Sequence, residues 1–306
     1  MDITIVIRQL FILFTLVSIG VILRRTKVLD QSSNATLTQL LLKVVMPAAI
    51  LTGIADSIGV RERSYLLYVL GMSVFAYLML MLLAVGTAWL LRPKTSEDQG
   101  ALASICMFPN IIYIGIPLTI SLWGPEYLFY PALFNLIANL FAFSIGLKIL
   151  AGSKAKISPK LIFNTLMNVS LFAIALFLIG IPLPAIVNAP LFHLRDMMTP
   201  MGMILLGSIL GGMELKKVFS GWRVYAAVAV KLLVAPVVMF LILSQLIADP
   251  VMLGIFVLLS SSPAAIRTVL LAIQYGGNAE MVSQGAFLST ALSIVTIPLI
   301  ILLLGL

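Results

Sequence analysis

The stretch Cys106-Met-Phe-Pro-Asn-Ile-Ile-Tyr-Ile-Gly-Ile-Pro-Leu118 places two prolines and a glycine inside an apolar segment. Proline lacks a backbone N–H and clashes with the preceding helical turn. Pro109 and Pro117, with Gly115 between them, therefore predict a broken helix. In lipid the freed carbonyls must find partners within the protein, and the amide of Asn110 is suited either to one of them or to a substrate.

A second stretch, Leu259-Ser-Ser-Ser-Pro-Ala-Ala-Ile-Arg267, carries a comparable break later in the chain. Ser262 suits a helix N-cap and Pro263 suits the first helical position, so a new helix is predicted to begin there. A helix N-terminus carries unpaired N–H groups and a partial positive charge, and Arg267 lies about one turn further in. These features predict an anion site at mid-membrane depth, where transporters hold their substrates.

The composition identifies lipid as the solvent for most of the surface. Of 306 residues, 61% are hydrophobic and only 10% are charged, against about 25% charged in a soluble domain. The net charge of +8 does not indicate nucleic-acid binding, because the basic residues sit in short loops between apolar runs. The single cysteine, Cys106, excludes an internal disulfide.

Ten stretches are long and apolar enough to cross a membrane as helices. No soluble domain separates them, so the expected fold is an all-α membrane protein with ten transmembrane helices. The spans are Ile3–Leu23, Ser33–Ala55, Tyr65–Leu91, Gly100–Leu122, Tyr127–Leu150, Leu161–Ile179, Leu191–Met213, Trp222–Ile247, Val251–Tyr275 and Ala279–Leu304.

The basic residues of the loops predict the orientation in a bacterial cell membrane. Loops after the odd-numbered spans hold most of them, and the other loops hold only Arg61, Arg63 and Arg195. By the positive-inside rule the first set faces the cytoplasm, which leaves both termini outside. The first set is Arg24, Arg25, Lys27, Arg92, Lys94, Lys148, Lys154, Lys156, Lys160, Lys216, Lys217 and Arg223.

The prolines predict an internal repeat. Pro47 and Pro200 are 153 residues apart, which is half the length of the 306-residue chain, and Pro109 and Pro263 are 154 apart. Because each half would hold five spans, the second half would enter the membrane from the opposite side. We expect inverted repeats at residues 1–153 and 154–306. Pro47, Pro200 and Pro236 are interpreted as simple kinks.

Three cations, Lys43, Lys231 and Arg267, lie well inside predicted spans, where each needs a partner or a wet cavity. Asp196 occupies the repeat position equivalent to Lys43, so the two side chains are candidates for a structural ion pair. Lys231 is expected either to snorkel toward the cytoplasm or to bridge carbonyls freed by a break. The excess of cations favours an anionic substrate.

Asn135 and Asn139 are four residues apart and share one helix face, where they line the substrate site or hydrogen-bond between helices. An enzyme is not expected. A lone histidine, His193, excludes the common two-histidine zinc motif, and no phosphate-binding loop or dinucleotide fingerprint occurs. We therefore expect no metal and no cofactor.

Pro109-Asn110, followed by Gly115-Ile-Pro-Leu118, resembles the broken helix of the auxin efflux carrier family. The resemblance continues through Pro263, Tyr275-Gly276 and Ser289-Thr290 to Pro298. It implies an elevator carrier, in which spans one, two, six and seven form a scaffold that dimerises. Spans three to five and eight to ten would form the transport domain and bind the substrate where the broken helices cross.

The chain departs from the plant auxin exporters in two places. Only Ala151–Lys160 stands where those proteins have a long cytoplasmic loop, and Arg267 adds a charge that the plant proteins are not expected to have. This favours a smaller or more highly charged anion over auxin.

The sequence thus predicts a secondary carrier of a small organic anion, a mono- or dicarboxylate such as malate, malonate or an auxin-like acid. The alternatives are a sodium-coupled carrier of larger amphipathic acids and a membrane sensor that binds a ligand without transporting it. The expected partners are the substrate, the bilayer and a second copy of the chain. Candidate substrate-binding residues are Asn110, Ile111, Gly115, Pro117, Asn135, Asn139, Ser261, Ser262, Pro263 and Arg267; structural or coupling candidates are Lys43, Asp196 and Lys231.

Overall fold

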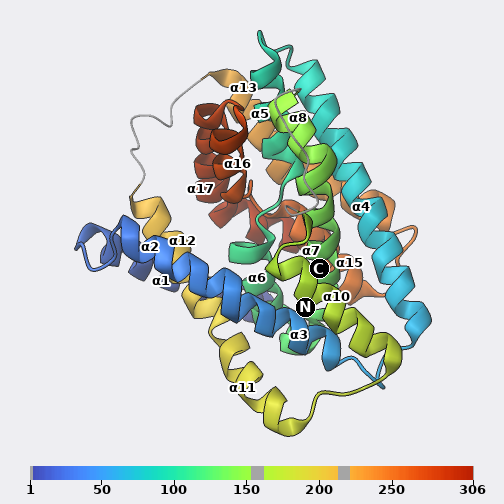
Figure 1. Ribbon diagram of the computed structural model, residues 1–306. Coiled ribbons are helices and arrows are strands. Elements are labelled where there is room, and N and C mark those ends of the chain that lie inside the picture. The colour runs from blue at the N-terminus through green and yellow to red at the C-terminus, as the bar shows by residue number, and fades with distance from the viewer. Residues whose placement is uncertain (1–2, 153–161, 213–220, 306) are drawn as a thin grey trace. The chain divides into compact units, whose positions relative to one another are not determined.

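The computed structural model describes residues 3–152, 162–212 and 221–305. Within these ranges every regular element is a helix, which confirms the predicted all-helical class (Figure 1). The chain forms two compact units. Unit 1 comprises Met1–Gly71, Ile112–Leu136 and Phe163–Met213, and unit 2 comprises Met72–Ile111, Ile137–Ile162 and Glu214–Leu306. The repeat boundary predicted at residues 153 and 154 lies outside the described residues, as do Lys154, Lys156, Lys160, Lys216 and Lys217.

Unit 1 is built mainly from the first and third quarters of the chain. Two helices, α4 (Arg63–Leu90) and α7 (Phe129–Phe141), begin in it and continue into unit 2. Its other elements are α1 (Ile3–Arg25), α2 (Gln31–Leu40), η1 (Leu41–Val45), α3 (Met46–Ala55), η2 (Ile111–Gly115, which starts at the boundary), α6 (Ile116–Trp123), η3 (Pro125–Tyr127), α10 (Thr165–Ile179), α11 (Ala185–Asp196) and α12 (Met198–Gly211).

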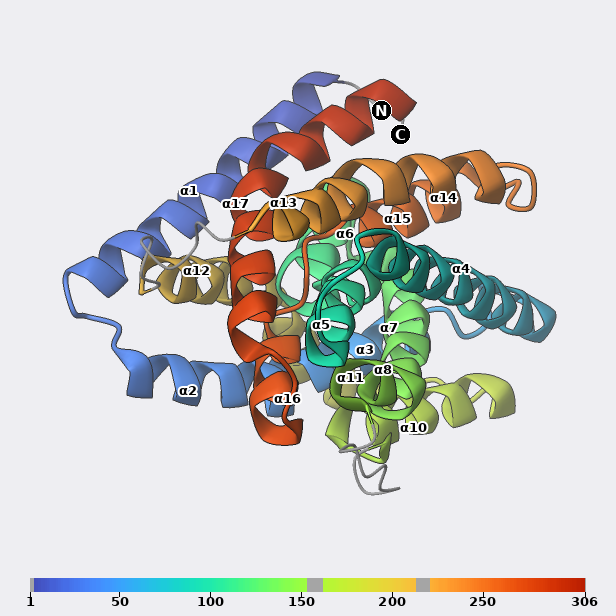
Figure 2. The ribbon, with the colours of Figure 1, turned by 90° about the horizontal axis from the view of Figure 1, so that it is seen from above.

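Unit 2 contains the helices on either side of the second break: α15 (Pro250–Ser261) ends before it and α16 (Arg267–Tyr275) begins after it. The last helix, α17 (Ala279–Leu304), packs against α16 and also contacts α5, α13 and α15 (Figure 2). The remaining elements are α5 (Ser96–Met107), η4 (Ala142–Gly146), α8 (Leu147–Ala151), α13 (Trp222–Ala229), η7 (Val230–Val234) and α14 (Ala235–Leu243).

Six helical stretches in the described residues are long and apolar enough to cross a membrane. Three shorter apolar helices, Ile111–Trp123, Thr165–Ile179 and Pro250–Ser261, overlap three of the other predicted spans. The ten-span topology stays a prediction. The six are Ile7–Arg25, Gln31–Ala55, Arg63–Leu90, Phe129–Ala151, Trp222–Leu243 and Ala279–Leu304.

The predicted seventh span, Leu191–Met213, is not one helix in the structure. It is divided at Met197 into α11 and α12. Pro200 has no N–H to bond the carbonyl of Asp196, where α11 ends, and it becomes the third residue of α12. A proline in the first turn costs no hydrogen bond, because the N–H groups there have no helical partner. The prediction that Pro200 kinks a continuous helix is therefore wrong.

Three other prolines follow a π-helical turn. Pro47, Pro117 and Pro236 are each the second residue of the α-helix that follows η1, η2 and η7, respectively. The carbonyl four residues before each proline, which a regular α-helix would bring against the ring, belongs to the third residue of the π turn. The wider turn relieves this clash. The interpretation of Pro47 and Pro236 as kinks stays a prediction.

Helices α1 and α12 approach closely enough in unit 1 to require glycine. A Cβ at Gly207 would lie 1.9 Å from the carbonyl oxygen of Val17, and one at Gly20 would lie 2.0 Å from the carbonyl oxygen of Ile204. Both obstacles are backbone atoms and cannot rotate away. Contact of this kind is the usual way in which membrane helices pack through small residues.

We expect Gly207→Ala to destabilise the protein by about 1–3 kcal/mol, because overpacking forces the two helix backbones apart. Thermal unfolding in detergent measures the effect. Gly71→Ala in α4 is the matched control, since a Cβ there meets nothing within 4 Å, and its melting temperature should stay the same or rise. Equal melting temperatures for Gly207→Ala and the wild type would contradict the packing described.

Candidate functional site

The first helix break spans Phe108–Asn110. Helix α5 ends at Met107, and Phe108 has the extended backbone angles φ −104° and ψ 97°. The residue before a proline is disfavoured in the helical region, which explains why α5 stops before Pro109. Phe108 and Asn110 are both buried, with 1% and 2% of their surface exposed.

The second break begins one residue after α15. Ser262 has φ −60° and ψ 140°, its N–H bonds back to the carbonyl of Leu258, and its hydroxyl donates to the same oxygen at 3.1 Å. Ser262 is therefore the C-cap of α15. The predictions that it caps a new helix and that Pro263 is the first helical residue are wrong, because α16 begins only at Arg267.

The two breaks bond to each other inside unit 2. Pro109 and Ala264 form an antiparallel bridge. The N–H of Asn110 donates to the carbonyl of Pro263 at 2.7 Å, and the N–H of Ala265 donates to the carbonyl of Phe108 at 2.8 Å. We call these two segments, Phe108–Asn110 and Pro263–Ala265, the junction. These bonds pair backbone groups that the two breaks take out of their helices, as a membrane interior favours.

Two buried side chains complete the junction. Ser289 of α17 accepts a hydrogen bond from the N–H of Ala264 at 3.0 Å. Without the break, that N–H would bond the carbonyl of Ser260 in a continuous helix. The carbonyl of Ser260 is instead bonded by the ammonium group of Lys231, at 3.0 Å. Lys231 is fully buried, so of its two predicted roles the structure favours bridging a freed carbonyl over snorkelling.

The start of α16 is polar and partly buried. The guanidinium of Arg267 donates a short hydrogen bond to the side-chain oxygen of Asn139, which is 2% exposed. Within the described residues the hydroxyl of Thr268, which is 1% exposed, has no hydrogen-bond partner. The Ile266 N–H likewise has none there. A cation, an amide N–H and a hydroxyl are thus gathered at one helix N-terminus.

Three acidic side chains of unit 2 bond to neighbouring groups of their own. Asp98 accepts a hydrogen bond from Asn278 at 2.7 Å, and Asp249 caps α15 through the N–H of Val251. Glu280 accepts from Gln284 at 3.4 Å. The hydrogen bond from Arg267 to Asn139 is to a neutral amide, so that contact does not cancel the positive charge of the guanidinium.

The structure separates the remaining predicted site residues into two groups. Ile111 and Ser261 flank the junction in unit 2, where the N–H of Ile111 bonds the carbonyl of Pro109 and the hydroxyl of Ser261 bonds the carbonyl of Leu258. Gly115, Pro117 and Asn135 belong to unit 1. The side chain of Asn135 is fully buried, and both of its polar atoms lack a partner within the described residues.

The predicted ion pair between Lys43 and Asp196 is not present among the described residues. Lys43 is exposed and donates to Gln39 of its own helix at 3.4 Å, while Asp196 pairs with its neighbour Arg195 at 3.2 Å. Arg195 also lies 3.7 Å from Asp56. Equivalent positions in a proposed repeat need not be neighbours in space.

Ser289, which bonds the junction, and Thr268 of α16 are polar residues that were not among the candidates selected from the sequence. Ser289 belongs to one of the pairs that carried the family resemblance, Ser289-Thr290, but its role as an acceptor depends on the break in another helix. Nothing in the sequence marks Thr268, since a threonine in an apolar helix usually bonds a carbonyl of its own helix.

We expect Ser289→Ala to lower stability by about 1–3 kcal/mol, because the buried N–H of Ala264 loses its acceptor. Ser293→Ala is the matched control: Ser293 is buried in the same helix but donates only to the carbonyl of Thr290. Thermal unfolding in detergent compares the two. A loss no larger for Ser289→Ala than for Ser293→Ala would contradict the role assigned to Ser289.

Comparison with known proteins gives a consistent result along the whole chain. The family model described as "Membrane transport protein" matches residues 5–165 and 159–301. A relative described as an uncharacterized transporter, from Methanothermobacter thermautotrophicus, is 25% identical over 297 residues, covering 93% of each chain. The chain belongs to the membrane transport protein family, the auxin efflux carrier family that its proline motifs resemble.

Proposed function

We propose that this transport protein is a secondary carrier of a small organic anion, a mono- or dicarboxylate such as malate, malonate or an auxin-like acid. The observation that carries the proposal is the start of α16, where Arg267, the N–H of Ile266 and the hydroxyl of Thr268 lie beside the junction. A helix N-terminus favours anions through its unpaired N–H groups and its dipole. The guanidinium adds a planar fork of donors that matches a carboxylate.

The polar groups at this site suit recognition as well as charge. A substrate carboxylate would accept from Arg267 and from the Ile266 N–H, while Thr268 would bond a second oxygen. Asn139 holds the guanidinium in place through its side-chain oxygen. Asn110 remains a candidate ligand of the substrate through its side-chain amide. Its backbone N–H is used separately, in the junction.

Lys231 bears on the choice between the proposed carrier and the sodium-coupled alternative. Carbonyls freed by a helix break can bind sodium. The carbonyl of Ser260 is freed in this way but is bonded by the ammonium group of Lys231, which supplies the positive charge itself. This favours an anion carrier that needs no sodium at that carbonyl. Membership in a transporter family argues against a sensor that binds without transporting.

We further propose transport by elevator motion in a bacterial cell membrane, with both termini outside. Spans one, two, six and seven would form a dimeric scaffold, and spans three to five and eight to ten would carry the substrate. Unit 1 contains all four scaffold segments, and the close contact of α1 with α12 is suited to a rigid support. Gly115, Pro117 and Asn135, which also lie in unit 1, stay proposed members of the site.

We expect Arg267→Ala to raise the KM for carboxylate uptake into proteoliposomes by roughly 10- to 100-fold, because a hydrogen bond to a charged group contributes about 1.5–3 kcal/mol. Arg267→Lys should recover part of the loss, since it restores the charge without the fork. Malate, malonate and an auxin-like acid are tested separately, with and without sodium.

Arg63→Ala serves as the control. Arg63 is exposed at the start of α4 in unit 1, and the substitution removes the same charge as Arg267→Ala. It should transport as the wild type does. If Arg267→Ala and Asn110→Ala both left uptake unchanged while remaining folded, the site would be assigned wrongly. Uptake that requires sodium would favour the sodium-coupled carrier.

A further inference from the structure

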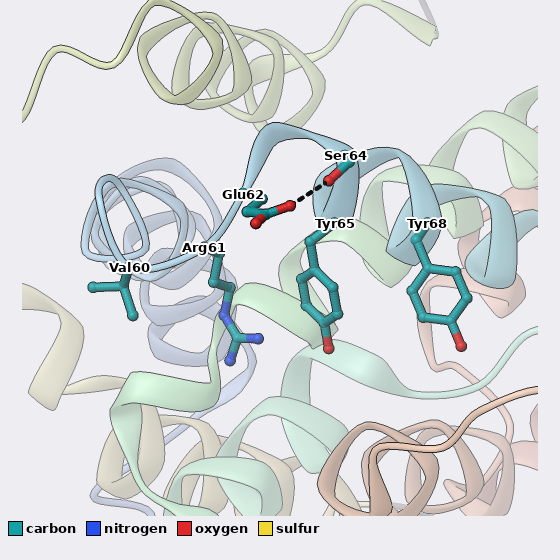
Figure 3. A pocket seen from close by; sticks show the side chains of 6 residues that line it. All are labelled: Val60, Arg61, Glu62, Ser64, Tyr65 and Tyr68. Carbon is teal, nitrogen blue, oxygen red and sulfur yellow. Dashed lines mark hydrogen bonds between the residues drawn. The ribbon is translucent and has the colours of Figure 1, made fainter.

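A pocket of about 430 Å3 lies in unit 1 at the turn between α3 and α4 (Figure 3). It is lined by Val60, Arg61, Glu62, Ser64, Tyr65 and Tyr68, all from one short stretch of chain. None of these residues belongs to the junction or to the start of α16. The pocket therefore calls for a separate explanation.

Arg61 is held in the pocket by aromatic rings. The carbon of its guanidinium lies 5.1 Å from the ring centre of Tyr65, 5.2 Å from that of Phe129 and 4.8 Å from that of Tyr130. One of its nitrogens donates to the hydroxyl of Tyr130 at 2.9 Å, and that hydroxyl lies 2.8 Å from the hydroxyl of Tyr65. Ring contacts of this kind fix the guanidinium through its electron-poor faces.

The charge of Arg61 has no counter-ion in the part of the chain that the structure describes. Among the described residues no carboxylate lies within ion-pair distance of its guanidinium. Glu62 accepts instead from the hydroxyl of Ser64 at 3.0 Å, and in Figure 3 its carboxylate turns toward Ser64, away from Arg61. Asp56, before the turn, pairs with Arg195. A partly buried cation without an anion is unfavourable, so the pocket is suited to an anion from outside the chain.

The position of the pocket indicates which anion. It lies between two membrane-spanning stretches, Gln31–Ala55 and Arg63–Leu90, which places it at a membrane surface. Tyrosines gather at such surfaces because their rings are apolar and their hydroxyls are polar. Val60, which lines the pocket, is apolar and 80% exposed. A soluble anion needs no apolar neighbour, whereas a lipid presents a phosphate next to apolar groups.

We propose that this pocket binds the phosphate group of an anionic membrane lipid, with Arg61 as the phosphate ligand and Tyr65 and Tyr68 as its aromatic walls. One N–H of the guanidinium is used by Tyr130, and the other in-plane donors remain suited to two phosphate oxygens. In Figure 3 the side chains of Arg61, Tyr65 and Tyr68 extend in the same direction. The site does not depend on the transported substrate.

Thermal unfolding of delipidated protein in detergent tests the proposal. Phosphatidylglycerol, added in the same detergent, should raise the melting temperature, because a ligand that binds only the folded state stabilises it. Phosphatidylcholine and inorganic phosphate at equal concentration should raise it less. Arg61→Gln keeps a polar side chain without the charge, and it should lose more than half of the shift caused by phosphatidylglycerol.

Arg63→Ala is the matched control, since it removes a neighbouring arginine that does not line the pocket; it should keep the full shift. Where Arg61→Gln does not fold, Arg61→Lys replaces it and should show a reduced shift. An undiminished shift in the folded Arg61 variant, or an equal shift with phosphatidylcholine, would overturn the proposal. So would an equal, Arg61-dependent shift with inorganic phosphate or malate, which would assign the pocket to a soluble anion.

Discussion

The need to pair backbone N–H and carbonyl groups without water governs the arrangement of the two helix breaks in unit 2. Two helices are interrupted there by proline, and each interruption supplies what the other lacks. Asn110 donates to the carbonyl of Pro263, and Ala265 donates to the carbonyl of Phe108. Because proline has no N–H, the donors are residues that follow the prolines: Asn110 directly follows Pro109, and Ala265 lies two residues after Pro263. Neither break would be tolerable alone in lipid.

The exchange leaves one helical hydrogen bond to be replaced by side chains. The N–H of Ala264 and the carbonyl of Ser260 would bond each other in a continuous helix. In the structure Ser289 accepts from the first and Lys231 donates to the second. A buried ammonium is expensive in a membrane, but here it bonds a carbonyl that would otherwise be unsatisfied. The same break therefore accounts for a buried lysine and for a serine in a neighbouring helix.

The sequence located the breaks because proline acts on its own chain, through a missing donor and a local clash. It also selected Arg267 and Asn139 as site residues. The hydrogen bond between Arg267 and Asn139 could not be predicted, because it depends on how α7 and α16 pack. The errors have the same origin. The cap pattern at Ser262 predicts a bond to the following helix, but the hydroxyl bonds back to Leu258. Repeat symmetry relates Lys43 to Asp196 but does not establish proximity.

At the junction, backbone atoms hold the two breaks together, while the side chains proposed to bind a ligand lie outside those bonds. Phe108–Asn110 and Pro263–Ala265 are joined by backbone atoms and are buried, so their bonds do not depend on the identity of most side chains nearby. The groups that would meet a ligand, Arg267, Thr268 and Asn139, lie on helices next to the junction and do not take part in its backbone bonds. Replacing these side chains would alter the charge and hydrogen-bonding capacity of the site while the backbone frame remained. Under the proposed function, specificity therefore resides in these side chains and not in the fold.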